Sequence, residues 1–285
     1  MALDGSRVGD EIGRIYSVVD ARWLMSYAAG IPDERPELFD TIGGLVVHPM
    51  FPVAPEWDLL VRHRSAPRSM PTAEIVRGVH SAHDVIIDRP IGVGATVTIR
   101  AVVVGVDRRV AGATQRVRFE AVDAAGQTLW RTMLTSVFIG VELAGEPSSI
   151  DVDWPSVPAR TAASGVTIDE RHSVVHLIDA HVYSECARIW NPIHTDVATA
   201  RAAGLPAPIL HGTATMARAV SACADMAEVR LADVRRVGGS FAAMVPLGST
   251  IDIRLLEVDG STLHFDVVDH EGRRAIRDGF IQLRS

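Results

Sequence analysis

The sequence predicts an α+β protein built from two copies of one unit, in which an early helix precedes a series of antiparallel strands. Three observations lead to this fold class. Four short patterns recur in the same order in the two halves of the 285-residue chain. The segments with strand character alternate apolar and polar residues. A stretch rich in Pro, Ser and Ala separates the two halves.

The strand segments supply two of the four correspondences. Residues 94–100 (GATVTIR) return as residues 248–254 (GSTIDIR), and in both copies a glycine turn opens a strand. Residues 122–127 (VDAAGQ) return as residues 268–273 (VDHEGR). Each of these predicts a hairpin with an Asp-x-x-Gly turn, so the strands of each half follow one another as antiparallel neighbours.

A helix segment is also repeated. Residues 18–32 (VVDARWLMSYAAGIP) correspond to residues 177–191 (LIDAHVYSECARIWN). Asp20 and Asp179 are candidate N-caps, because a carboxylate at that position accepts hydrogen bonds from the first backbone N–H groups of a helix. Both segments therefore predict a helix of about ten residues.

These repeats define a domain organisation. We expect an N-terminal unit over residues 1–145, a linker over residues 146–165 and a C-terminal unit over residues 166–285. In each unit a curled antiparallel sheet would wrap around a central helix. We expect the two sheets to pair edge to edge, because that pairing removes two exposed strand edges.

The bulk composition excludes several classes of protein. Hydrophobic residues make up 47% and charged residues 22%, which favours a packed core over disorder. The net charge of −7 and the lack of a Lys/Arg-rich run argue against nucleic-acid binding. The two cysteines, Cys186 and Cys223, have neither disulfide-framework nor metal-ligand spacing. No signal-peptide pattern or membrane-spanning apolar run is present, so we expect a cytoplasmic protein that needs no metal or cofactor.

Differences between the halves indicate which copy carries chemistry. The fourth echo, LVVHP against PILHG, aligns Pro49 with Gly212, and the helix alignment places Arg35 opposite His194. Proline has no backbone N–H, whereas Gly212 has one and allows close approach of a ligand. Gly212 or Thr213 would also begin a helix, whose N-terminus stabilises a developing oxyanion. The C-terminal half thus holds a candidate base in His194 and a candidate oxyanion donor in Gly212.

At these positions the sequence resembles the MaoC-like dehydratases, also called type 2 or (R)-specific enoyl-CoA hydratases. The segments NPIHTD (residues 191–196), AAGLPAPILHG (residues 202–212) and GSTIDIR (residues 248–254) carry the resemblance. Residues 46–57 and 89–100 resemble the degenerate N-terminal unit of family members that have two units in one chain. The resemblance implies a double hot-dog fold with a degenerate N-terminal copy.

The resemblance also implies a reaction. Water adds across the double bond of a trans-2-enoyl-CoA, or is removed from a 3-hydroxyacyl-CoA, as in fatty acid metabolism. His194 matches the catalytic histidine, the N–H of Gly212 would hold the thioester oxygen, and Asn191 would shape the turn that aims the histidine. Trp190 and Thr213 are expected to contribute to the substrate-binding wall. Imidazole suits this role because it deprotonates water near neutral pH, while a fixed donor stabilises the enolate.

The sequence departs from the family at the catalytic acid. The family has an Asp two residues before the Asn of its NPxH motif, and this position is Ile189; Arg188 replaces the usual Gly. Glu185 lies four residues before Ile189 and is the candidate replacement acid, because one helical turn would bring both to the same side. Alternatively, Arg188 would bind an acyl group that carries a polar or carboxylate function.

Three functions therefore stay open from the sequence. The chain would be an enoyl-CoA hydratase or dehydratase, a thioesterase on the same fold, or a non-catalytic acyl-CoA-binding subunit. Ile189 favours the second and third functions, whereas the retained His194 and Gly212 favour catalysis. The expected partners are an acyl-CoA thioester and a second copy of the chain, or an active partner hydratase.

Three prolines suggest how the N-terminal unit differs from its sister. Pro49, Pro52 and Pro55 fall where the other half is expected to form its central helix. Since proline breaks a helix interior, we expect a broken helix at this place. The space left by that helix would hold a long or bulky acyl group.

Overall fold

The protein is described here by a computed structural model that covers residues 3–64, 70–161 and 166–284. These residues form one 11-stranded antiparallel sheet, whose strands are β1 (Glu11–Val19), β2 (Gly78–Ile87), β3 (Ala95–Arg109), β4 (Gly112–Val122), β5 (Thr128–Ile139), β6 (Ser148–Ser149), β7 (Asp169–Val175), β8 (Val234–Phe241), β9 (Ser249–Asp259), β10 (Thr262–Asp269) and β11 (Arg274–Leu283). Their spatial order is β1-β3-β4-β5-β2-β8-β11-β10-β9-β7, and the short β6 pairs with β3. The order repeats about the β2–β8 pair, as two copies of one unit require.

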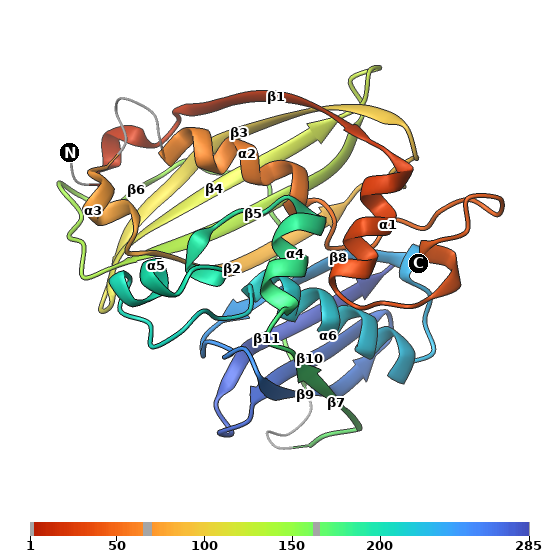
Figure 1. Cartoon of the computed structure of the whole chain (residues 1–285). Coiled ribbons are helices and arrows are strands. Elements are labelled where there is room, and N and C mark those ends of the chain that lie inside the picture. The colour runs from red at the N-terminus through yellow and green to blue at the C-terminus, as the bar shows by residue number, and fades with distance from the viewer. Residues whose placement is uncertain (1–2, 65–69, 162–165, 285) are drawn as a thin grey trace.

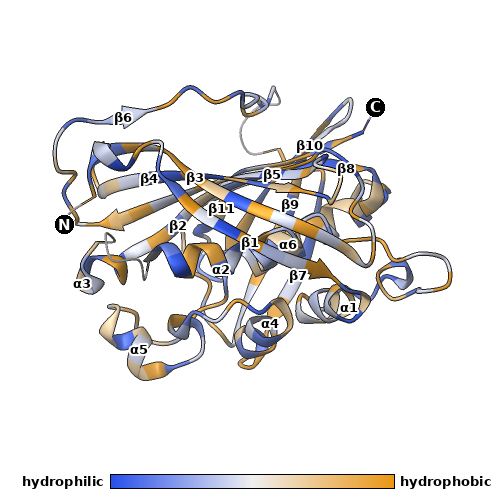
Figure 2. Ribbon diagram, turned by 90° about the horizontal axis from the view of Figure 1, so that it is seen from above, coloured by the Kyte–Doolittle hydropathy of each residue, from blue (hydrophilic) through white to orange (hydrophobic). Residues whose placement is uncertain are grey.

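The helices gather on one side of this sheet (Figures 1 and 2). They are α1 (Ala21–Gly30), α2 (Val53–Arg64), α3 (Thr72–Ile75), α4 (Asp179–Ala187), α5 (Val197–Ala202) and α6 (Gly212–Met226), with short 3-10 turns at η1 (Gly5–Arg7), η2 (Pro36–Leu38), η3 (Pro192–His194) and η4 (Leu231–Asp233). The two longest helices, α2 and α6, lie in front of the N-terminal and C-terminal strands respectively in the view of Figure 1. The fold is α+β and is the expected double hot dog. Within the described ranges, none of these helices has the length and apolar character needed to cross a membrane.

The predicted turns recur at matching places in the two copies. Asp123 Oδ1 accepts hydrogen bonds from the backbone N–H groups two and four residues further on, at 2.9 and 2.8 Å. Asp269 Oδ1 does the same in the second copy, at 3.0 and 2.8 Å. Gly126 and Gly272 close these turns with φ of +77° and +76°, a left-handed conformation that favours glycine. The local turn chemistry therefore explains why the repeat is visible in the sequence.

Of the two predicted N-caps, Asp20 is confirmed and Asp179 is wrong. Asp20 caps α1, and its carboxylate accepts a hydrogen bond of 2.9 Å from the backbone N–H of Trp23. Asp179 is instead the first residue of α4. Its carboxylate accepts from the N–H of His176 at 2.9 Å and pairs with the buried guanidinium of Arg218 at 2.8 Å. The second acid therefore joins the start of α4 to α6 as well as to its own chain segment.

The prediction that the prolines break the N-terminal helix is wrong. Helix α2 is continuous for 12 residues and begins at Val53. Pro49 and Pro52 precede it, and Pro55 lies in its first turn, where a missing N–H leaves no hydrogen bond unmade. Helix α6 begins at Gly212, the position that aligns with Pro49. The prolines thus delay the start of the helix by about one turn instead of breaking it.

Strands β2 and β8 join the two units into one sheet, as the sequence predicts. Asp84 faces Gly238 across this antiparallel pair, and Val85 faces Val237. The largest apolar cluster contains residues of both units, including Phe119 of β4 and Phe265 of β10. Since the sheet and the apolar core both continue across the join, the units share one interior.

A buried ion pair ties this join to the segment between the units. The guanidinium of Arg236 on β8 donates two hydrogen bonds to the carboxylate of Asp84 on β2, at 2.9 and 2.6 Å. It also donates to the carbonyl of Ser156 at 3.0 Å, and the indole N–H of Trp154 donates to Asp84 at 2.9 Å. The segment that follows β6 thus crosses the sheet on the side opposite the helices (Figure 2). Residues 162–165 of the predicted linker lie outside the described residues.

Removing one member of this pair tests its contribution to stability. The Arg236 and Asp84 side chains are only 4% and 14% exposed, so Arg236→Met leaves an uncompensated carboxylate in the interior. We expect the free energy of unfolding to fall by about 3–5 kcal/mol, measured by urea denaturation.

Arg230→Met is the matched control. Arg230 pairs with Asp233 on the surface, where water screens the charges, so its loss should leave the denaturation midpoint nearly unchanged. Equal midpoint shifts for the two variants would contradict a stabilising role for the buried pair.

Candidate functional site

The NPIH segment turns sharply out of helix α4. The helix ends at Ala187, and Arg188 adopts a left-handed conformation with φ of +59°. The backbone N–H of Ile189 then donates to the carbonyl of Ser184 at 3.0 Å. Asn191 is extended and Pro192 opens the 3-10 turn η3, which ends at the histidine. This short turn fixes the position from which the histidine side chain projects.

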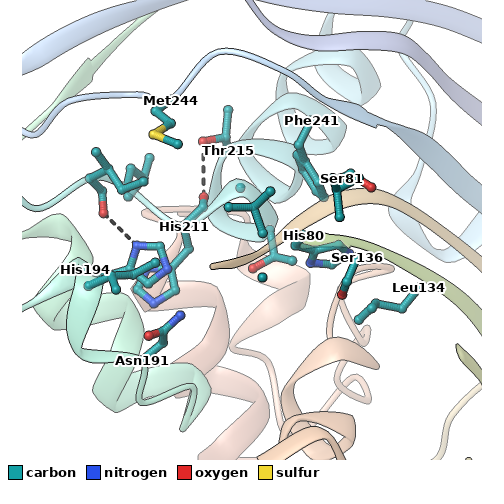
Figure 3. Close-up of a pocket in the computed structure, with 18 of the residues that line it drawn as sticks. His80, Ser81, Leu134, Ser136, Asn191, His194, His211, Thr215, Phe241 and Met244 are labelled. Carbon is teal, nitrogen blue, oxygen red and sulfur yellow. Dashed lines mark hydrogen bonds between the residues drawn. The ribbon is translucent and has the colours of Figure 1, made fainter. Parts of the chain in front are cut away.

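His194 is held as a neutral imidazole with one free lone pair. Its Nδ1 lies 2.9 Å from the carbonyl oxygen of Ile209 (Figure 3). A carbonyl only accepts, so Nδ1 carries the hydrogen and Nε2 carries the lone pair. The side chain is 9% exposed, and this burial lowers its pKa to about 4. At neutral pH the ring is therefore a base of fixed tautomer.

A second histidine stacks on this ring. The ring centroids of His194 and His211 are 3.6 Å apart and their planes differ by 24°. Figure 3 shows the two rings side by side above Asn191. The Nε2 of His211 lies 3.3 Å from the buried hydroxyl of Ser184. Burial, and then the neighbouring His194, hold the pKa of His211 well below its ordinary value. The stack fixes the plane of the His194 ring.

Gly212 lies at the start of the helix that runs back from this pair. It is the first residue of α6, where a backbone N–H has no partner within the helix. A Cβ atom at this position would lie 2.9 Å from the ring of Phe241, so only glycine fits without displacing the ring. The hydroxyl of the next residue, Thr213, accepts a hydrogen bond of 3.1 Å from Tyr183. The N-terminus of α6 therefore presents a free donor at a tightly packed place.

These groups line a cavity of about 400 Å³ that draws on both units. His194, Gly212, Asn191, Ile189 and Thr213 all belong to its wall. The opposite wall comes from the N-terminal unit, and Figure 3 shows part of it across from the histidine pair. That wall includes Val53, Glu56, Trp57, Leu60, His80, Ser81, Phe119, Leu134 and Ser136. The cavity therefore combines a base, a backbone donor and a largely apolar interior.

Three of the predicted site residues lie outside this cavity. Glu185 is exposed on α4, so the structure does not bring it to Ile189 or to the histidine. The guanidinium of Arg188 stacks over the ring of Trp23 at 4.2 Å, which directs it away from the cavity. Trp190 is 54% exposed and contributes nothing to the wall. The expected roles of Glu185, Arg188 and Trp190 at the substrate are therefore corrected.

Sequence reasoning missed an acid in the cavity wall. Among the described residues that line the cavity, Glu56 is the only one with a carboxyl group. It belongs to a face of α2 that also contains Val53, Trp57 and Leu60, with the spacing of one helical stripe. A single acid inside an otherwise apolar stripe is the signal that would have found it. The same described residues hold no group of three His, Cys, Asp or Glu side chains placed to bind a metal ion.

Comparisons with known proteins agree with this fold. Residues 167–277 match the family model of the MaoC like domain. The chain is 28% identical over 177 residues to peroxisomal multifunctional enzyme type 2 of Drosophila melanogaster, a match that covers 61% of this chain and 29% of that protein. It is 36% identical over 91 residues to fatty acid synthase subunit beta of Aspergillus oryzae, which covers 31% of this chain and 4% of that protein. The chain thus spans a small part of the curated relatives it matches.

A solved structure resembles the whole chain. The MaoC-like dehydratase from Phytophthora capsici superposes with a TM-score of 0.85 at 20% identity, covering 99% of this chain and 98% of that one. The similarity extends over both units, whereas the family model covers the C-terminal unit, where His194 and Gly212 lie. The chain therefore has the double hot-dog fold of that protein, and residues 167–277 of its C-terminal unit match the MaoC like domain.

Proposed function

We propose that the protein is an acyl-CoA hydratase/dehydratase that adds water to a trans-2-enoyl-CoA or removes it from a 3-hydroxyacyl-CoA. The observation that carries the proposal is the shared cavity, in which a neutral histidine and the free N–H of a helix N-terminus line one apolar space. The base and the oxyanion donor are the two groups that the reaction requires.

In the proposed hydration, Gly212 and His194 act on opposite ends of the reacting group. The thioester oxygen accepts a hydrogen bond from the N–H of Gly212. Nε2 of His194 takes a proton from water, whose oxygen bonds to Cβ while the double-bond electrons move to form the enolate. The imidazolium then returns its proton to Cα, so one water has been added across the double bond. Dehydration follows the same steps in reverse.

The low pKa of His194 suits a residue that serves in both proton transfers. A base with a pKa of about 4 gives an imidazolium that releases its proton readily. Ile189 contributes an apolar part of the wall where the resemblance implies an acid, so no carboxylate at that position raises the pKa of the ring. We infer that His194 replaces the usual acid–base pair by acting alone.

One observation favours a second function, a non-catalytic acyl-CoA-binding subunit. Ile189 is buried in the wall of the cavity, at the position where the resemblance leads us to expect an acid, and the described wall offers no carboxyl group from helix α4. Such a subunit would bind an acyl-CoA without changing it and would need an active partner chain.

One assay separates these functions. Purified protein is mixed with a panel of enoyl-CoAs, and the conjugated thioester absorbance and free CoA are followed together. Loss of conjugation without CoA release supports hydration, CoA release supports thioesterase chemistry, and neither change supports the binding subunit.

Replacing His194 tests the base directly. His194→Gln retains a polar side chain of similar size but has no lone pair basic enough to deprotonate water. We expect kcat to fall by about 10²–10⁴-fold in the hydration assay. His172→Gln, which changes an exposed histidine on β7, should keep full activity. Full activity of His194→Gln would remove His194 from the mechanism.

Adding a methyl group at Gly212 tests the oxyanion donor. In Gly212→Ala the new Cβ meets the Phe241 ring at 2.9 Å, so the helix N-terminus or the ring has to move. We expect kcat to fall by about 10–10³-fold, since a displaced donor no longer meets the thioester oxygen. The double variant Gly212→Ala/Phe241→Leu relieves the contact and should recover much of the loss. If it recovers nothing while both proteins stay folded, the close packing is not what positions the donor.

The pH dependence tests the environment of His194. Its pKa is lowered, so the active base form persists down to about pH 4, and kcat/KM should stay flat between about pH 5.5 and 7.5. Ile189→Asp restores the family acid, which should raise the pKa of the ring and move the acidic limb upward. The free energy of unfolding should depend on pH in the same range. The unfolded chain binds a proton at this histidine near pH 6.5, whereas the folded protein does so only near pH 4. The protein should therefore lose stability as the pH falls below about 6.5. An acidic limb near pH 6.5 in the unmodified protein would contradict the buried, neutral histidine.

A further inference from the structure

The sheet has a gap beside the candidate site, where β2 and β8 separate. Ala82 and Ser240 are the last residues that face each other across this pair. Beyond them, residues 78–80 of β2 pair with β5 alone, and Phe241 of β8 pairs with β11 alone, in the part of the sheet that the structure describes. The two strands therefore leave a space between them on this side of the join.

The cavity extends into this gap. Its wall includes four consecutive residues of β2, 78–81, and five consecutive residues from the end of β8 onward, 241–245. Successive residues of a strand point to opposite faces of the sheet, so a space bounded by such a run reaches the plane of the sheet. Ile139 and Met244, on the two sides of the gap, are 46% and 41% exposed and also line the cavity. The body of the cavity thus lies on the helix side, and its opening lies between β2 and the segment after β8.

Arg277 of β11 lies beside this opening. Among the described residues that line the cavity, it is the only lysine or arginine. It faces Ser240, the residue at which β8 leaves β2. Ser240 shares a face of the sheet with Gly238, two residues earlier, and Gly238 faces Asp84. Arg277 therefore belongs to the face of the sheet opposite the helices.

The guanidinium of Arg277 has no acidic partner among the described residues. The side chain is exposed and makes no ion pair, not even with the adjacent Asp278. On the same strand, Arg274 pairs with Asp266 at 3.6 Å. The positive charge at the opening is therefore available to an anion from outside the chain.

A second guanidinium borders the same opening. The side chain of Arg77 packs on Gly140, the residue after Ile139, and within the described ranges it also has no ion pair. Two uncompensated positive charges thus lie around the opening of a chain whose net charge is −7. Such an arrangement attracts a negatively charged ligand to this part of the surface.

The distance from the donor to Arg277 suits the arm that carries a thioester. The ring of Phe241 contacts Gly212 from the sheet, and Ile276, the strand partner of Phe241, precedes Arg277. The path from Gly212 to Arg277 therefore crosses one sheet, a distance on the order of 10 Å. A pantetheine arm contains two amides and is about as long as four extended residues, roughly 13 Å. Its phosphate would reach the guanidinium while the thioester oxygen lies at Gly212.

We propose that Arg277 binds a phosphate at the end of the pantetheine arm, and that the arm passes through the gap between β2 and β8. This inference rests on the proposed acyl-thioester function and adds the surface that holds the carrier of the acyl group. A guanidinium binds phosphate through charge and paired hydrogen bonds. The phosphate has two sources, CoA and the phosphopantetheine arm of a carrier protein, and the test distinguishes them.

The test compares three saturated thioesters with the same acyl chain, namely acyl-CoA, acyl-phosphopantetheine and acyl-pantetheine, of which the last has no phosphate. Binding is measured by calorimetry, which requires no catalysis. Arg277→Gln should weaken acyl-CoA binding about 5–30-fold, because a charge-assisted bond at an exposed site is partly screened, and should leave acyl-pantetheine binding unchanged. Arg277→Lys, which keeps the charge, should retain part of the affinity.

The two phosphate-bearing ligands locate the phosphate. An equal loss for acyl-phosphopantetheine and acyl-CoA supports the phosphate that CoA shares with a carrier protein. A loss for acyl-CoA alone supports a phosphate that only CoA carries.

Arg274→Gln is the matched control. It removes the same charge from the same strand, but Arg274 does not line the cavity and already pairs with Asp266. This variant should bind acyl-CoA as the unmodified protein does.

The outcomes separate this inference from the proposed function. If Arg277→Gln binds all three ligands as the unmodified protein does, or weakens all three equally, the phosphate site is overturned. A loss confined to phosphate-bearing ligands, with no hydration of any enoyl-CoA, upholds the site and overturns the hydratase. Hydration that is independent of Arg277 and of the phosphate does the reverse.

Discussion

The pairing of β2 with β8 is the constraint on which the rest of the structure depends. It joins two five-stranded copies into one sheet, so that the helices of both copies lie on the same face. It also brings His80 of β2 and Phe241 of β8 into ring contact, and Phe241 in turn closes over Gly212. Without this pairing, the C-terminal unit would keep its histidine and its donor but would lose the opposite wall of the cavity. The Arg236–Asp84 pair lies at the same join but on the opposite face of the sheet. The ion pair that stabilises the join is therefore on the other side of the sheet from the cavity.

Sequence reasoning succeeded where the structure is set by neighbouring residues. The Asp-x-x-Gly turns, the Asp20 cap and the NPIH turn are local, so the repeat, the edge-to-edge sheet and the position of His194 could be predicted. Glu185 failed because the one-turn rule applies only within a helix. Helix α4 ends at Ala187, and the left-handed Arg188 turns the chain before Ile189, so Glu185 and Ile189 do not share a helical face.

The other misses come from long-range contacts or from alignment at a helix end. Glu56 is defined as a buried acid by Trp130 and Thr132, which lie 74 and 76 residues further along the chain. The apolar stripe of α2 singles out Glu56 in the sequence, but no local pattern reveals these two distant partners. Pro49 aligns with Gly212, where α6 begins, but α2 begins only at Val53. The alignment alone does not show that the helix of the N-terminal copy starts later than that of the C-terminal copy. Pro55 is harmless because it falls in a first turn instead of a helix interior.

The left-handed turn at Arg188 has a consequence for how the two copies depend on each other. A non-glycine residue in this conformation is strained, and the stacking of its guanidinium on Trp23 of α1 helps to hold it there. Trp23 belongs to the copy that has no base of its own. The direction in which the NPIH turn leaves its helix is therefore set partly by a side chain of the sister unit. The N-terminal copy therefore helps to orient the histidine of the C-terminal copy through a side chain that lies outside the wall of the cavity.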